Sequence, residues 1–423
     1  MRTDLPNANK PAAGGQLWLI TMAVAVAGWL ASVVWPSALV RLGIYDYGMR
    51  FLDSYAVLAA LDAVRAGADP HVANPLDVLM RYHVYSDWWL AMRWLGLTRE
   101  HNFGLGLSWL AGFAVTVVVT MRPRRLGECV WLACLLVSPA VLLVVNRANN
   151  DLVIFILLGI AGWYAAAGGW RLLVSVGCLM LAVGLKYYPV VAVLPLLWVR
   201  PRRKMPAVFL GGLVAVVLVL ASVWSELDRG RFPVGIGVHT MGAPILGRDL
   251  GWTDGESFLF GLLFLGLTAL GLAWSRLTEG LAREGGLPER MLAAIGAVVV
   301  LACFLAAVNY AYRWVFLLWP AFWMWRRLRQ ADPASRRSRV VAGIGCGLVA
   351  LAFWADGVFC LAINALPPKG GDWVNHAQGI YRLWTQPGQW LLMALLAGWL
   401  LEGVLAIIGS WWRDRGVRPT SDQ

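Results

Sequence analysis

Charged residues are scarce in this sequence of 423 residues. Asp, Glu, Lys and Arg make up only 14% of it, whereas residues of the AVILMFWYC class make up 59%. A soluble domain carries about a quarter charged residues, so the composition excludes an ordinary soluble enzyme and a disordered chain. Long apolar runs recur from end to end instead, and this pattern predicts an all-α, polytopic membrane protein.

The sequence also lacks the usual motifs for metals and nucleotides. Its six cysteines lie inside apolar runs without metal-ligand spacing, and its outer acidic residues form no clustered ligand set. It contains no Walker sequence and no GxGxxG motif after a strand. We therefore expect no metal site, no bound cofactor and no cradle for a nucleotide or nucleotide-sugar.

The apolar runs predict about 12 transmembrane helices in a single membrane-embedded domain that covers residues 1–423. The runs are 17–39, 103–121, 127–145, 151–168, 171–185, 189–199, 205–225, 258–275, 291–308, 314–325, 340–363 and 389–411. An even number of crossings places both termini on one side. Runs 189–199 and 314–325 are shorter than a full span, and we interpret each as half of a tight hairpin.

Positive charge indicates the orientation. The basic clusters on the side of the termini are Arg122–Arg125, Arg200–Lys204, Arg326–Arg329 and Arg336–Arg339. The positive-inside rule makes that side cytoplasmic, so we expect a bacterial inner-membrane protein with both termini inside. The net charge of +12 thus reports orientation, and no nucleic-acid partner is expected.

Three longer loops are expected on the outer, periplasmic face: 40–102, 226–257 and 364–388. All five histidines of the sequence fall in these loops. In the first loop, the apolar spacing after Asp53 predicts an amphipathic helix that ends at Gly67. A second helix rich in Trp and Tyr is predicted over 76–95. Because the cytoplasmic loops are short, any chemistry is expected outside.

Two aspartates follow the first predicted span. Asp53 immediately precedes the amphipathic helix, and Asp46 lies in the Tyr45-Asp46-Tyr47-Gly48 segment. A carboxylate beside a membrane-surface cavity is suited to accept the proton of an attacking sugar hydroxyl. The structural alternatives are a helix N-cap for Asp53 and an ordinary turn residue for Asp46.

The three shortest outer turns each contain one cation, namely Arg147, Lys186 and Arg313. Charges so near hydrocarbon usually face a bundle interior or a partner. Asn and Tyr donors flank these cations: Asn149, Asn150, Tyr187, Tyr188, Tyr310 and Tyr312. The pattern favours a phosphate clamp. Snorkelling of each cation to lipid headgroups and pairing of Asp151 with Arg147 are the alternatives.

Parts of the sequence resemble glycosyltransferase family 87. Asp53-Ser54-Tyr55, the Ala- and Leu-rich stretch after it and Gly67-Ala68-Asp69-Pro70-His71 are similar to the first outer loop of that family, with His71 in place of a Tyr. The segment from Asn146 to Asp151 and the segment Gly184–Pro189 also resemble the family. The similarity covers roughly residues 17–325 and depends on the order and spacing of loose motifs.

The resemblance implies a GT-C fold and a glycosyltransferase of the mannosyltransferase type. Such an enzyme moves a sugar from a polyprenyl-phosphate donor in the membrane to a glycan or glycolipid acceptor on the outer face, without a cofactor. It implies Asp53 as general base, with Asp46 as the alternative. Lys186, Arg313 and Arg147 would hold the donor phosphate, and the flanking Asn and Tyr residues and His71 would contact substrate. The alternative functions are a multi-span transporter or lipid-linked sugar flippase, and an O-antigen-type polymerase or ligase.

Overall fold

The computed structural model describes residues 13–44, 48–198, 206–224, 239–275, 277, 286–329, 336–365 and 371–416. These residues are almost entirely helical. By length and composition, six of the described helices can cross a membrane. They are α1 (Ala13–Val34), α5 (Asn102–Thr120), α14 (Asp254–Trp274), α16 (Leu287–Ala306), α18 (Arg336–Asn364) and α19 (Gly371–Gly416). An all-α fold with several helices long and apolar enough to span a membrane is therefore confirmed.

Shorter helices fill the remaining apolar runs. A seventh span is formed if α6 (Leu126–Leu136) and α7 (Pro139–Asn146) count together, although they bend by 55° at the break formed by Val137 and Ser138. The others are α8 (Asp151–Ala167), α9 (Arg171–Leu185), η4 (Tyr188–Ala192), α10 (Val193–Leu196), α11 (Pro206–Ser222), η5 (Ala311–Leu317) and α17 (Leu318–Leu328). All twelve runs are thus largely helical, but the expected count of 12 spans is not confirmed.

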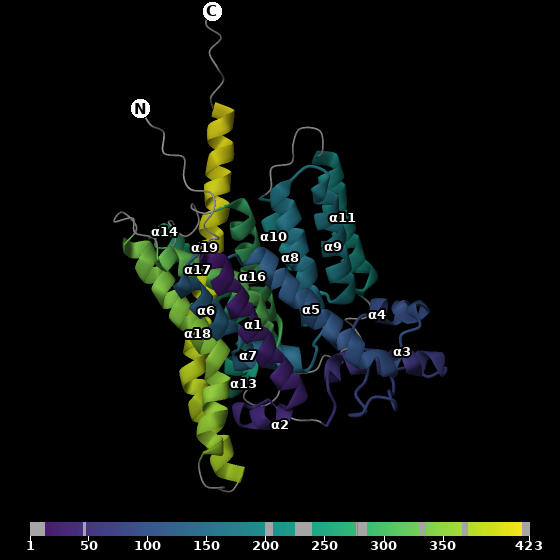
Figure 1. Cartoon of the computed structure of the whole chain (residues 1–423). Coiled ribbons are helices and arrows are strands. Elements are labelled where there is room, and N and C mark those ends of the chain that lie inside the picture. The colour runs from purple at the N-terminus through teal and green to yellow at the C-terminus, as the bar shows by residue number, and fades with distance from the viewer. Residues whose placement is uncertain are drawn as a thin grey trace, which may run out of the picture.

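Helix ends gather at two opposite ends of the bundle. The end of α19 lies at the upper end in Figure 1, and the lower end carries α2 (Pro36–Leu39), η1 (Val40–Leu42) and α13 (Ala243–Asp249). The segment that holds α3 and α4, within the loop predicted over 40–102, forms a lobe at the right of the bundle. A two-stranded antiparallel pairing of β1 (Thr240–Met241) with β2 (Asn309–Tyr310) joins two loops that are distant in the sequence.

The lobe contains α3 (Leu52–Arg65), α4 (Asp87–Ala91) and two 3-10 helices, η2 (Met92–Leu95) and η3 (Arg99–His101). The first helix agrees with the prediction, but the helix predicted over 76–95 is wrong before Asp87. The Asp77 carboxylate accepts bonds from the backbone N–H groups of Leu79 and Arg81. Met80 between them has a φ of 51°. Side-chain capping therefore replaces the helical ladder in that stretch.

Aromatic packing fixes α8 in the centre of the bundle. Phe155 stacks on Trp319 with ring centroids 4.0 Å apart and meets Phe113 edge-on at 5.0 Å. Gly159 permits close approach, because a Cβ there would lie 2.6 Å from the Thr116 side chain. The buried face of α8 holds the start of the helix, at Asp151, in a fixed position against α5, α9 and α16.

Candidate functional site

Backbone hydrogen bonds attach the start of α3 to the end of α7. The amide of Phe51 donates to Asn146 O at 3.3 Å, and the amide of Asp53 donates to Arg147 O at 2.9 Å. Phe51 is the N-cap of α3, with a left-handed φ of 57° and its buried ring against Gly106. The N-cap interpretation of Asp53 is therefore wrong. Its side chain is directed at neighbouring segments instead.

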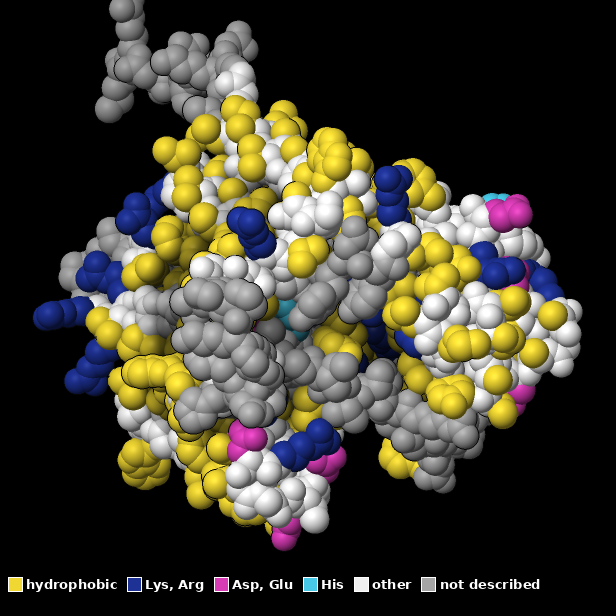
Figure 2. Space-filling view, turned by 90° about the horizontal axis from the view of Figure 1, so that it is seen from below, with side chains coloured by type: hydrophobic (Ala, Val, Ile, Leu, Met, Phe, Trp, Pro, Cys, Tyr) yellow, Lys and Arg dark blue, Asp and Glu magenta, His cyan; other side chains and the backbone are white. Residues whose placement is uncertain are grey.

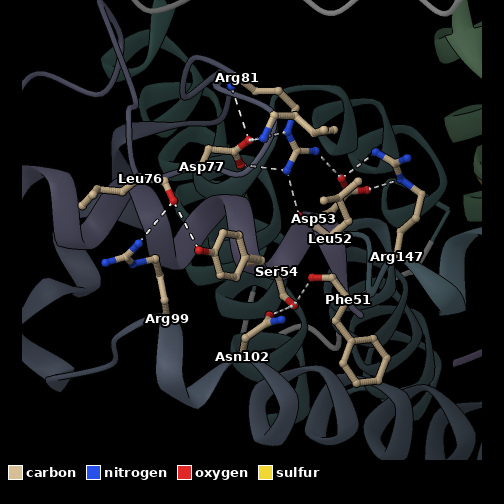
Figure 3. Close-up of polar contacts among 12 residues, drawn as sticks. Phe51, Leu52, Asp53, Ser54, Leu76, Asp77, Arg81, Arg99, Asn102 and Arg147 are labelled. Atoms are coloured by element: carbon tan, nitrogen blue, oxygen red, sulfur yellow. Dashed lines mark hydrogen bonds and ion pairs between the residues drawn. The ribbon is translucent and has the colours of Figure 1, made fainter. Parts of the chain in front are cut away.

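The Asp53 carboxylate joins three segments of the chain (Figure 3). Its Oδ1 accepts from Arg147 Nη2 at 2.7 Å and from Arg81 Nη1 at 3.0 Å. Its Oδ2 accepts from Arg147 Nε at 2.8 Å and from Asn149 Nδ2 at 2.7 Å. Four good hydrogen bonds fill the acceptor capacity of this carboxylate. Asp53 and Arg147, which the sequence analysis singled out separately, are thus direct partners.

The surroundings of Asp53 favour its charged form. Burial acts to raise its pKa, but the charge and hydrogen bonds of Arg147, the charge of Arg81 and the bond from Asn149 lower the pKa to about 2. The pKa of the nearby Tyr85 hydroxyl is raised instead, first by burial and then by the Asp53 charge. At neutral pH, Asp53 is an anion whose negative charge is already matched.

Arg81 is a site residue that the sequence analysis missed. Its guanidinium bonds Asp77 Oδ2 at 2.8 Å, Asp53 at 3.0 Å and the carbonyl of Leu52 at 2.8 Å. Asp77 is buried. The spacing of Asp77 and Arg81 is also that of a helical ion pair, so it offered no signal that the arginine reaches Asp53. The fold of the lobe provides that contact.

The turn between α7 and α8 supplies the centre of the network. Ala148 has a φ of 40°, a strained value for a residue with a Cβ, and it reverses the chain after Arg147. Asn149 then bridges two acids: its Nδ2 bonds Asp53, and its Oδ1 accepts from the amide of Asp151 at 2.9 Å. Lys186 Nζ lies 3.5 Å from the same Asn149 oxygen. A single amide side chain therefore connects the two halves of the site.

Asp151 organises the second half of the site. Its Oδ1 accepts from Lys186 Nζ and, at 2.7 Å, from the Tyr188 hydroxyl. Arg313 Nε lies 3.7 Å from Asp151 Oδ2, and Arg313 Nη1 bonds Asn309 of β2. The expected alternative partner was Arg147, but Asp151 pairs with Lys186 and Arg313. All three predicted cations thus belong to one network.

Aromatic rings form the walls around these cations. Arg313 lies over the Tyr188 ring at 4.9 Å, and Lys186 lies 5.5 Å from the centre of the Tyr85 ring. Tyr310 and Tyr312 stack on each other at 5.5 Å next to Arg313. The α4 helix is held at this place because Trp89 Nε1 bonds the carbonyl of Leu185, the residue before Lys186. Cation–π contacts of this kind stabilise desolvated charges.

The network combines buried acids with more accessible cations. Asp53 and Asp151 expose at most 2% of their side chains, whereas the four cations expose between 9% and 28%. With Asp77, three carboxylates face four cations. Figure 2, a view from below, shows the surface hollowed between the lobe and the helix bundle, with Lys or Arg side chains at that hollow. The accessible part of the site therefore presents positive charge, which is suited to an anion.

The remaining predicted residues have varied positions. Asn150 is fully buried, whereas Tyr187 is half-buried. His71 bonds Asp87 at 2.7 Å and the carbonyl of His83 at 2.9 Å, so it stabilises the lobe. Asp46 lies outside the described residues.

No protein-family model, no curated protein and no solved structure matches this chain.

Proposed function

We propose that this protein is a membrane glycosyltransferase that moves a sugar, mannose by default, from a polyprenyl-phosphate donor to an acceptor hydroxyl on the outer face. One observation carries the proposal: cations from three separate turns, Arg147, Lys186 and Arg313, meet in one network with Asp53. With Arg81, Asp77 and Asp151 included, the network has four cations and three carboxylates, and its three arginines are the more accessible groups. This is the charge pattern that a single phosphodiester requires.

The orientation that we propose places this site in the periplasm. We propose twelve crossings of a bacterial inner membrane with both termini in the cytoplasm, and the six or seven described helices that are long and apolar enough to span it support a multi-pass protein. Three of the basic clusters lie among the described residues. Arg326–Arg329 lies at the end of α17 and Arg336–Arg339 at the start of α18, at the upper end of Figure 1, and Arg122–Arg125 lies beside them, because Arg326 bonds the carbonyl of Arg122. The lobe lies nearer the lower end. The positive-inside rule then makes the lower end external.

An apolar groove supports a lipid-linked donor. It has a volume of about 550 Å³, and apolar side chains of η4, α10, α16 and α19 line it, among them Val191, Leu194, Leu301 and Leu401. The segment that forms one wall begins at Tyr188, which contacts Asp151 and Arg313. A prenyl chain in this groove would therefore have its phosphate near the cations.

The proposed reaction is a direct displacement at the anomeric carbon. A carboxylate of the network takes the proton of the acceptor hydroxyl, and Lys186, Arg147 and Arg313 stabilise charge that develops on the leaving prenyl phosphate. Loss of one such preorganised donor costs about 3–4 kcal/mol of transition-state stabilisation in measured oxyanion sites. The resemblance to glycosyltransferase family 87 suggests Asp53 as that base, and this remains a prediction.

The test uses purified protein in lipid vesicles with radiolabelled mannosyl polyprenyl phosphate and a short mannoside as acceptor. We expect transfer that needs no ion gradient, which separates this function from a transporter or flippase. Lys186→Ala should abolish transfer while membrane expression stays normal. Arg171→Ala is the matched control, because Arg171 is an exposed cation at the opposite end of the same helix. Near-normal turnover of Lys186→Ala would contradict the proposal.

A further inference from the structure

The two central carboxylates differ in how completely they are bonded. Both oxygens of Asp53 accept two hydrogen bonds each. Asp151 Oδ2 is fully buried and has no hydrogen-bond partner among the described residues. The facing Arg313 Nε, 3.7 Å away, is also buried without a hydrogen-bond acceptor there. Buried polar atoms are normally paired, so this acceptor and donor require an explanation.

The chemistry of the pair selects its ligand. One group that satisfies both atoms must donate a proton to Asp151 Oδ2 and accept one from Arg313 Nε. A hydroxyl does both, because it has one O–H donor and two lone pairs. A phosphodiester has acceptors only, and its charge would be repelled by Asp151. The adjacent Asn150 is completely buried, and neither polar atom of its side chain has a hydrogen-bond partner in the described part of the chain.

We propose that Asp151 is the general base that takes the proton of the acceptor hydroxyl, and that Arg313 Nε orients this hydroxyl. The assignment rests on the proposed function and deepens it. Asp53 then has a different task, which is to hold Arg81 and Arg147 in place for the phosphate. The Arg313 side chain is 21% exposed and Asp151 is fully buried, so an incoming hydroxyl meets the guanidinium first.

The step is balanced in atoms and charge. The acceptor oxygen forms a bond to the anomeric carbon with one of its lone pairs. The bond from the anomeric carbon to the phosphate oxygen breaks, and its electron pair stays on the prenyl phosphate. The hydroxyl proton moves to Asp151 Oδ2. The leaving prenyl phosphate gains one negative charge, which lies beside Lys186 and Arg147.

The bonding of Asp53 makes it the weaker candidate for the base. A hydroxyl could reach an Asp53 lone pair only after one of four hydrogen bonds had been broken. Its pKa of about 2 also makes it a poor proton acceptor near neutral pH. Asp151 offers an oxygen that needs no bond to be broken.

The experiment compares two isosteric variants, Asp151→Asn and Asp53→Asn, in the same vesicle assay. Turnover is measured with saturating mannosyl polyprenyl phosphate, and affinity for sugar-free polyprenyl phosphate is measured separately by tryptophan fluorescence. We expect Asp151→Asn to lower kcat at least 100-fold and to bind polyprenyl phosphate as well as the unmodified protein does, or more tightly. We expect Asp53→Asn to weaken that binding at least tenfold.

A second pair of variants, Asp151→Ala and Asp53→Ala, distinguishes loss of the general base from loss of folding. Asp151→Ala should regain at least a tenth of the lost kcat with sodium formate, which supplies a small carboxylate in the space, and Asp53→Ala should not. A kcat for Asp151→Asn within threefold of normal would overturn the assignment and leave the proposed function standing. Formate rescue of Asp53→Ala alone would also overturn it. Absence of transfer by the unmodified protein would overturn the proposed function and this assignment together.

Discussion

The two halves of the polar network have the same kinds of charge but different bonding. In the Asp53 half, formed by Asp53, Asp77, Arg81 and Arg147, each carboxylate accepts several hydrogen bonds, and these tie the lobe to the helix bundle. In the Asp151 half, buried polar atoms lack hydrogen-bond partners among the described residues. A fully satisfied network stabilises one structure, whereas a partly satisfied one is suited to bind a ligand.

The largest expected effect comes from removing the anchor of the satisfied half. Asp53→Ala leaves Arg81 and Arg147 close together without their shared counter-charge. Breaking a buried ion pair by removing one partner costs about 3–5 kcal/mol, so the thermal unfolding midpoint in detergent micelles should fall markedly. Asp151→Asn, which keeps shape and hydrogen-bonding atoms, should lower the midpoint less. The reverse order would show that the Asp151 half is the structural one.

The next largest expected effect is a loss of stability at low pH, which should come from the Asp53 half of the network. The pKa of Asp53 is lowered from 3.8 to about 2 in the folded state. A lowered carboxyl pKa contributes stability that is complete above about pH 4 and disappears as the pH falls toward 2, and here it amounts to about 2 kcal/mol. Denaturant unfolding followed by tryptophan fluorescence at pH 5, 4, 3 and 2.5 measures this loss.

Asp53→Asn serves as the control for that measurement, because it removes the titrating group. Its stability should be low already at pH 5 and should fall less steeply toward pH 2.5. Equal slopes for the variant and the unmodified protein would show that Asp53 does not hold the charge of the first half.

The smallest effect is expected at the turn that joins the halves. Ala148 adopts a φ of 40°, where glycine is less strained than a residue with a Cβ. Ala148→Gly should therefore raise stability by about 0.5 kcal/mol after its larger unfolded-state entropy is subtracted. Ala148→Val should lower stability by about 1 kcal/mol, since a β-branched side chain fits this conformation worse. If valine is tolerated as well as glycine, the turn is not strained.

Local sequence patterns were enough to predict some of the site residues. Short polar turns between apolar runs identified Arg147, Lys186 and Arg313, because a charge so near hydrocarbon needs a partner. The same reasoning missed Arg81, which lies in a polar loop where a charge is unexceptional. It also predicted a helix over 76–95, which is wrong before Asp87, since hydrophobic spacing does not register the Asp77 side-chain bonds that replace the helical backbone hydrogen bonds there.

By itself, the sequence determined the class of protein, the positions of the apolar helices and the turns in which cations stand, because hydropathy and spacing act over neighbouring residues. Only the tertiary structure decided which charges meet. Asp53 and Arg147 are 94 residues apart, and Asp151 and Lys186 are 35 apart. Their pairing depends on how α3, α7, α8 and α9 pack at one end of the bundle. Packing also determined that Asp53 is fully bonded while Asp151 keeps an oxygen without a hydrogen-bond partner among the described residues.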